Sequence, residues 1–251
     1  MTIAQHSYPR IVGHRGAAAL APENTLASIR AAAANGVTWI EVDSKLAGDD
    51  IPVLFHDETL DRTTNTTGRV ANRSAAELAH FDAGSWFGPA GNPAFAGEPV
   101  PTLAQALTEV RKLGLGLDLE IKPDKDRTVE TATHSLEVLS EAGFTSADPL
   151  LVTSFQPEAL RIFHTYAPEF ARGLLIWKWP DGWLETARAL GCVAVISDQQ
   201  SLVTESDVRQ ITDAGFLAMT YTVNDRDRAE QLLGWGVTSV VTDDPTVMLG
   251  L

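Results

Sequence analysis

Five short motifs in the first half of the chain carry the side chains that could do chemistry. In chain order they are His14-Arg15-Gly16, Pro22-Glu23-Asn24-Thr25, Glu41-Val42-Asp43, His56-Asp57 and Glu120-Ile121-Lys122. Histidines can transfer protons near neutral pH, carboxylate oxygens hold hard divalent cations, and arginine and lysine bind phosphate. Together these residue types predict a metal-dependent site that cleaves phosphoesters.

The candidate metal ligands are Glu41, Asp43 and Glu120. Because side chains alternate along a strand, Glu41 and Asp43 should face the same side, where two bare carboxylates would repel each other. Glu120 can add a third oxygen and leave positions open for water and a phosphate oxygen, as Mg²⁺ or Ca²⁺ requires. The alternative is that Glu41 or Glu120 caps a helix or pairs with a surface lysine. Placement of candidate residues at three strand ends favours the metal site.

Two basic side chains are candidate phosphate contacts. Arg15 precedes Gly16, which permits close approach of the backbone to a phosphate. Lys122 should face the same side as Glu120, where a cation would stabilise charge developing on the phosphoryl group. An ion pair between Lys122 and Glu120 is the alternative, and it is compatible with a catalytic site.

The candidate proton-transfer residues are His14 and His56, which are favoured by their positions at the predicted rim. Asn24 and Tyr221 complete the candidate substrate contacts. Asn24 could instead cap the first helix, or Glu23 and Asn24 could orient a metal ligand. Several aromatic residues could wall a pocket for a glycerol or alcohol moiety or could serve only as packing: Trp86, Phe87, Trp177, Trp179, Trp183 and Tyr221. The other histidines fall in the N-terminal tail, an insertion or helices: His6, His80, His134 and His164.

The elements that must position these residues follow a repeated strand–helix pattern, which predicts a parallel sheet. Strands are predicted at residues 10–14, 38–43, 51–55, 117–121, 150–154, 171–175, 193–196, 216–222 and 239–241. Segment 51–55 follows 38–43 too closely for a parallel crossover, and Gly48-Asp49-Asp50 indicates a turn. We therefore expect an eight-stranded (βα)8 (TIM) barrel whose second strand extends past the rim and returns as a hairpin carrying His56.

Helices are predicted between these strands, at residues 25–34, 102–113, 126–142, 157–166, 182–190, 204–214 and 225–233. The segment from about 57 to 100 is rich in Gly, Pro, Asn and Thr, with one short helical patch at 74–79. We expect this segment to be a small insertion subdomain over the barrel mouth, within a single domain spanning residues 1–251.

Composition narrows the class of partner. The 251-residue chain has 33 acidic and 19 basic side chains, a net charge of −14 and a pI near 4.7, which opposes binding to nucleic acid or to an anionic membrane. Residues 1–10 contain no apolar run preceded by basic residues, and no later apolar run is long enough to span a bilayer, so we expect neither an export signal nor a membrane span. The only cysteine, Cys192, lies in an apolar run and is expected to be buried and inert. We expect a cytoplasmic protein acting on a small molecule, with its oligomeric state open.

The motifs resemble those of the glycerophosphodiester phosphodiesterase family over nearly the whole chain. Besides the five motifs above, the resemblance includes the segment 55–64 (Phe-His-Asp-Glu-Thr-Leu-Asp-Arg-Thr-Thr), Tyr221-Thr222-Val223-Asn224 and Thr242-Asp243. Segments 8–12, 82–86 and 172–175 are similar to the short cytosolic bacterial form linked to glycerol-3-phosphate uptake. The chain departs from many members at its hairpin tip, Ala47-Gly48-Asp49-Asp50, and at Tyr221, where tryptophan is common.

The resemblance implies a TIM barrel with an insertion after the second histidine. It also implies metal ligands at Glu41, Asp43 and Glu120, an acid/base pair at His14 and His56, and phosphate contacts from Arg15 and Lys122. The implied reaction is metal-dependent hydrolysis of glycerophosphodiesters, such as glycerophosphocholine, to sn-glycerol 3-phosphate and an alcohol. The competing hypotheses are a phospholipase D acting on intact lipids and a barrel kept as a phosphate-binding scaffold.

Overall fold

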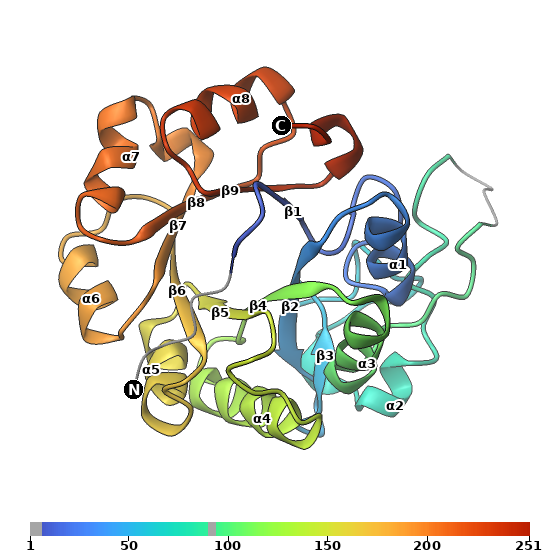
Figure 1. The fold of residues 1–251 in the computed structure, drawn as a ribbon. Helices are drawn as coiled ribbons and strands as arrows, with labels where there is room; N and C mark the ends of the chain where they lie inside the picture. The colour runs from blue at the N-terminus through green and yellow to red at the C-terminus, as the bar shows by residue number, and fades with distance from the viewer. Residues whose placement is uncertain (1–6, 90–93) are drawn as a thin grey trace.

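The strand–helix repeat closes into a barrel, with the helices outside the ring of strands (Figure 1). The computed structural model describes residues 7–89 and 94–251; His6 and part of the predicted insertion lie outside the described residues. Within that part of the chain, eight strands run parallel and a ninth, β3, is antiparallel. The strands are β1 (Ile11–Gly13), β2 (Trp39–Leu46), β3 (Pro52–Leu54), β4 (Gly116–Ile121), β5 (Leu150–Ser154), β6 (Ala171–Ile176), β7 (Ala194–Asp198), β8 (Leu217–Tyr221) and β9 (Ser239–Thr242).

The barrel closes where β1 pairs with both β9 and β2, with Gly13 opposite Ile40. The register of the β2–β4 pair brings two candidate metal ligands together, because it places Asp43 directly opposite Glu120. Almost every strand residue is buried, since barrel strands face packed side chains on both sides. This confirms the predicted TIM barrel.

The predicted hairpin is also confirmed. Strand β2 continues to Leu46 and pairs antiparallel with β3, with Ser44 opposite Leu54. The extension carries Lys45, whose ammonium group is buried and lies 2.7 Å from the Asp124 carboxylate in the loop after β4. Because an unpaired buried charge is strongly destabilising, this ion pair holds the hairpin against the loop that carries Lys122.

The helices begin and end close to the predicted positions. Thr25 and Thr102 each accept a hydrogen bond from the backbone of the helix that follows, which satisfies otherwise free N–H groups. Gly114 ends one helix in the left-handed region at φ +67°, where glycine carries no steric cost. The helices are α1 (Leu26–Ala34), α2 (Ala75–Leu78), α3 (Leu103–Leu113), α4 (Thr128–Glu141), α5 (Pro157–Tyr166), α6 (Trp183–Ala189), α7 (Glu205–Thr212) and α8 (Arg226–Gly234), with short 3₁₀ turns at Val70–Asn72, Gln199–Ser201 and Pro245–Met248.

The segment between β3 and α3 packs beside the hairpin, where Figure 1 shows α2 and its neighbouring loops next to β3 and α3. Its apolar residues, including Leu60, Val70 and Leu78, form a separate core cluster with Val53 of the hairpin. Two hydrogen bonds to residues 48 and 49 at the hairpin tip add to this contact. The inserted segment is therefore built on the hairpin that delivers His56.

Two sequence predictions concern features away from the rim. Cys192 is buried as expected, and burial raises the pKa of its thiol to about 12, so it stays protonated at neutral pH. None of the helices in residues 7–89 and 94–251 is both long enough and apolar enough to cross a bilayer.

Candidate active site

Three buried carboxylates meet at the carboxyl-terminal rim of the barrel. Glu41 and Asp43 project from β2 and Glu120 from β4, and one oxygen from each lies within 4.8 Å of the others. Burial, together with the neighbouring carboxylates, raises the pKa of Glu41 well above its usual range and that of Glu120 to about 7. One oxygen of Glu41, Oε1, is buried with no hydrogen-bond partner in the described part of the chain. The cluster is therefore compatible with a divalent cation, which would satisfy that oxygen and offset the repulsion.

Asp43 differs from the other two carboxylates in that its ionised form is stabilised by its neighbours. Burial alone would raise its pKa, but the nearby Lys122 and Arg15 outweigh burial and hold the pKa far below its usual range. The Asn24 amide donates to Asp43 Oδ2 at 2.7 Å, and its oxygen accepts the Asp43 backbone N–H at 3.0 Å. Asn24 thus uses both ends of its amide to orient Asp43, and Thr25 rather than Asn24 caps α1.

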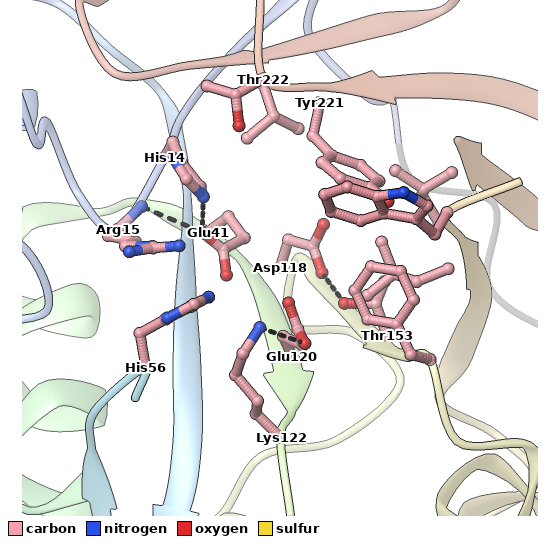
Figure 2. Close-up of a pocket in the computed structure, with 15 residues that line it drawn as sticks. His14, Arg15, Glu41, His56, Asp118, Glu120, Lys122, Thr153, Tyr221 and Thr222 are labelled. Carbon is pink, nitrogen blue, oxygen red and sulfur yellow. Dashed lines mark hydrogen bonds and ion pairs between the residues drawn. The ribbon is translucent and has the colours of Figure 1, made fainter. Parts of the chain in front are cut away.

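The two cations flank the carboxylates. Lys122 Nζ lies 2.8 Å from Glu120 Oε1 and 3.3 Å from Asp43 Oδ1, so the ion pair foreseen as an alternative is present within the site. Arg15 Nη1 donates to Glu23 at 2.6 Å, whereas its buried Nε makes no hydrogen bond to the described residues and lies 3.4 Å from Asp43. In Figure 2 Arg15 lies beside Glu41 and Lys122 beside Glu120, and all four residues line the same cavity.

Each candidate histidine is oriented by a carboxylate. His14 Nδ1 lies 2.6 Å from Asp243 Oδ1, and His56 Nδ1 lies 2.6 Å from Asp57 Oδ1. In each ring the other nitrogen, Nε2, makes no hydrogen bond to residues 7–89 or 94–251, and in His14 it lies 3.8 Å from Glu41; both histidines line the cavity. Asn224 holds Asp243 in turn at 2.6 Å. A histidine backed by a carboxylate has a fixed orientation and one defined nitrogen for proton transfer.

One arginine of the inserted segment, Arg62, connects the carboxylate that supports His56 with the carboxylate that supports Arg15. Arg62 donates to both oxygens of Glu23, at 2.7 and 2.8 Å, and to both oxygens of Asp57, the nearer at 2.7 Å. These bonds connect the support of His56 to Glu23, which in turn binds Arg15. Glu23 therefore orients Arg15 and does not cap α1.

The site opens into a cavity of about 600 Å³ at the barrel mouth. Asp118 and Thr153 supply polar groups to it and share a hydrogen bond of 2.7 Å, drawn in Figure 2. The Tyr221 ring makes an edge-on contact with Phe155, and the Tyr221 hydroxyl donates to the Ile176 carbonyl at 3.0 Å. The lining residues are His14, Arg15, Glu41, His56, Asp118, Glu120, Lys122, Thr153, Phe155, Leu175, Trp177, Ile196, Tyr221, Thr222 and Val241.

A second cavity, of about 510 Å³, is also lined by His14 and Arg15. It shares these two residues with the first cavity and includes none of the three clustered carboxylates. Its lining residues are His14, Arg15, Ala18, Ala19, Glu23, Trp86, Asn224, Asp243 and Asp244.

The structure thus brings the seven charged or titratable candidates around one rim, and Tyr221 onto the cavity wall. Asn24 is not among the residues lining the main cavity, which favours the alternative that it orients a ligand. Trp179 and Trp183 pack against each other and the core, with ring centroids 5.4 Å apart, so they do not wall the cavity. The residues given no role from sequence are Asp57, Arg62, Asp118 and Asp243; strand alternation from Glu120 could have indicated Asp118.

Comparisons with known proteins agree with this geometry. The model of the glycerophosphoryl diester phosphodiesterase family matches residues 14–247. The chain is 31% identical over 248 residues to a glycerophosphodiester phosphodiesterase of Bacillus subtilis, covering 93% of this chain and 83% of that protein. It is 29% identical over 244 residues to a glycerophosphodiester phosphodiesterase of Caldanaerobacter subterraneus, covering 96% of each. A phosphodiesterase of Oleispira antarctica, solved in complex with the product sn-glycerol-3-phosphate, superposes with a TM-score of 0.90 at 37% identity, covering 96% of this chain and 95% of that one.

Proposed function

Because this chain belongs to the glycerophosphoryl diester phosphodiesterase family, we propose that it hydrolyses glycerophosphodiesters such as glycerophosphocholine and glycerophosphoethanolamine to sn-glycerol 3-phosphate and a free alcohol. The observation that carries the proposal is one rim holding three clustered carboxylates, two carboxylate-backed histidines and two cations. The named activities of the two bacterial relatives support the same reaction, as does the product bound by the Oleispira protein.

We propose that Glu41, Asp43 and Glu120 hold one Mg²⁺ or Ca²⁺ ion. The donor set fits such an ion, since it consists of oxygen atoms alone and includes one buried oxygen without a hydrogen-bond partner among the described residues. A hard cation bound there would lower the pKa of a hydroxyl group and neutralise phosphate charge. Asn24 would keep Asp43 aimed at the ion.

The two histidines divide the proton transfers between them. His56 takes the proton of the glycerol 2-hydroxyl, whose oxygen then attacks phosphorus. His14 gives a proton to the departing alcohol oxygen as the old phosphorus–oxygen bond breaks. The product of this first step is a cyclic phosphate. In the second step His14 takes a proton from a water molecule that attacks phosphorus, and His56 returns its proton to the glycerol 2-oxygen, which gives sn-glycerol 3-phosphate. The assignment of His56 as the base is supported by its lowered pKa, which leaves it neutral and able to accept a proton at pH 7.

Arg15 and Lys122 bind the phosphate and stabilise the charge that grows on its oxygens. Asp43 and Glu120 raise the pKa of Lys122 in spite of its burial, so Lys122 stays charged throughout the working pH range. The Arg15 Nε that lacks a hydrogen-bond partner in the described part of the chain is a donor for one phosphate oxygen. Tyr221 contributes an apolar wall for the glycerol moiety.

The pH profile tests the base. Burial lowers the pKa of His56 and, together with Arg15 and Lys122, outweighs the opposing effects of Asp43 and Asp57. We therefore expect kcat/KM to fall with acid through an apparent pKa below the usual 6.5, because protonated His56 cannot accept a proton. Asp57→Asn should move this limb to still lower pH, since Asp57 raises the pKa of His56.

The control for that measurement is Asp61→Asn, a matched change in the same inserted segment, which should leave the limb in place. A wild-type limb above pH 6.5, or a limb that moves to higher pH in Asp57→Asn, would contradict the assignment. The reaction itself is tested by identifying the products from glycerophosphocholine. We expect sn-glycerol 3-phosphate and choline in equal amounts, whereas glycerol and phosphocholine would show that the other bond is cleaved.

We also propose that the chain acts as a single domain in the cytoplasm on a small-molecule substrate without a nucleic-acid partner. The net charge of −14 and the single buried cysteine support this proposal.

A further inference from the structure

Two cavities meet at the proposed phosphate position. The first, of about 600 Å³, and the second, of about 510 Å³, share only His14 and Arg15. A phosphodiester has two alcohol arms that diverge from one phosphorus atom. A phosphate held at Arg15 therefore has one cavity available for each arm.

The residues that line each cavity decide which arm it receives. Under the proposed function, the glycerol 2-hydroxyl must reach His56 and the carboxylate cluster. His56, Glu41 and Glu120 line the first cavity, and none of them lines the second. The glycerol arm therefore occupies the first cavity and directs the leaving alcohol into the second, past His14.

The second cavity has one aromatic side chain, Trp86, which comes from the inserted segment and is 37% exposed. Its indole N–H donates to the Ala83 carbonyl at 2.8 Å, and its ring contacts Phe87 edge-on at 5.7 Å between centroids. The indole nitrogen is therefore already bonded, and the ring is held by its neighbours. An indole face fixed in this way can bind a cation, including a quaternary ammonium group.

Acidic groups in the same cavity outnumber the cations. Glu23 is matched by Arg15 and Arg62, and Asp243 by His14. Asp244 has no such partner: its carboxylate accepts only from the backbone and hydroxyl of Thr246, and it forms no ion pair with any residue in 7–89 or 94–251. Asp244 is therefore the one acidic group lining this cavity that has no ion pair with the described residues, and Trp86 is the one aromatic ring lining it.

We propose that the second cavity binds the leaving headgroup and selects a positively charged one, such as the trimethylammonium group of choline, through Trp86 and Asp244. This inference rests on the proposed hydrolysis of glycerophosphodiesters and names the substrates within that class that the enzyme prefers. Trp86 and Asp244 would contact only the headgroup and not the reacting atoms, so they determine specificity and are not catalytic residues.

The test compares glycerophosphocholine, whose headgroup is cationic, with glycerophosphoglycerol, whose headgroup is neutral. We expect the wild type to have the higher kcat/KM for glycerophosphocholine. Trp86→Ala should lower kcat/KM for glycerophosphocholine by about 3- to 30-fold, the range expected for one cation–π contact, with little effect on glycerophosphoglycerol. Trp86→Phe should retain most of the preference, and Asp244→Asn should reduce it while keeping the hydrogen bonds to Thr246.

The matched control is Trp177→Ala, which removes an aromatic residue that is 62% exposed and lines the first cavity. This change should affect both substrates equally. The inference is overturned if Trp86→Ala and Asp244→Asn leave the substrate ratio unchanged, or if Trp177→Ala is the variant that changes it.

A binding measurement separates this inference from the proposed function. In an NMR titration of the whole protein with choline, the indole N–H signal of Trp86, assigned by its absence from Trp86→Phe, should shift. Glycerol should leave that signal unmoved. A shift without hydrolysis of either diester would support the cavity assignment and defeat the proposed function. Hydrolysis without a shift would uphold the function and overturn the cavity assignment.

Discussion

Replacing His14 with alanine should lower kcat for glycerophosphocholine by about 100- to 10,000-fold with little change in KM, because general acid catalysis contributes a factor of that size. His56→Ala should lose activity to a similar extent, since its lowered pKa suits it to accept the proton of the attacking hydroxyl. Binding should be nearly unaffected, because the proposed phosphate contacts, Arg15 and Lys122, remain in place. His80→Ala is the matched control, since His80 lies in the inserted segment and bonds a backbone carbonyl of α2.

The two histidines can be told apart by the leaving group. On a glycerophosphodiester whose alcohol is p-nitrophenol, the product anion departs without a proton, so His14→Ala should recover most of its rate. His56→Ala should not recover, because the nucleophile still has to lose its proton. Recovery by His56→Ala instead would exchange the two roles. A loss of only a few-fold for both variants on both substrates would remove acid/base catalysis from the mechanism.

The second large effect is expected at Asp43. Asp43→Asn removes a charge from the proposed ligand set and should raise the Mg²⁺ or Ca²⁺ concentration for half-maximal activity by more than about 100-fold. Residues that only support a ligand cost about 10- to 100-fold in metal affinity. Asn24→Ala, which removes the support of Asp43, should therefore fall within that smaller range.

Folding must be checked in the same variants. Asp43 lies at the carboxyl-terminal rim, where residues contribute more to the active site than to the stability of the barrel. The melting temperature of the Asp43→Asn variant should therefore stay close to that of the wild type. Unchanged half-saturating metal concentrations in a folded Asp43→Asn protein would exclude Asp43 as a ligand.

The barrel could be predicted from the sequence because its strands are buried on both sides and therefore form short, nearly continuous apolar runs. The hairpin followed from the short spacing between residues 43 and 51, which leaves no room for a parallel crossover. The burial of Lys45 in this extension of β2 was not predicted, because a lysine is rarely buried. Its partner Asp124 lies 79 positions further along the chain, and local sequence carries no signal for that contact.

In the candidate site too, contacts that follow from local sequence could be predicted, whereas contacts between distant residues could not. Alternation along β2 and β4, with strand-end placement, was enough to predict that Glu41, Asp43 and Glu120 meet. The partner of His14 is Asp243, 229 positions away, and it is brought there by barrel closure between β1 and β9. Arg62 was missed because its partners, Glu23 and Asp57, belong to different motifs whose distance depends on how the inserted segment packs.

The most direct test of the account is the metal dependence of product release from glycerophosphocholine. Protein stripped with EDTA and freed of the chelator should release no sn-glycerol 3-phosphate, and addition of Mg²⁺ or Ca²⁺ should restore release, with activity saturating at one bound ion per chain. Full turnover by the stripped protein would contradict the proposed role of the Glu41–Asp43–Glu120 cluster.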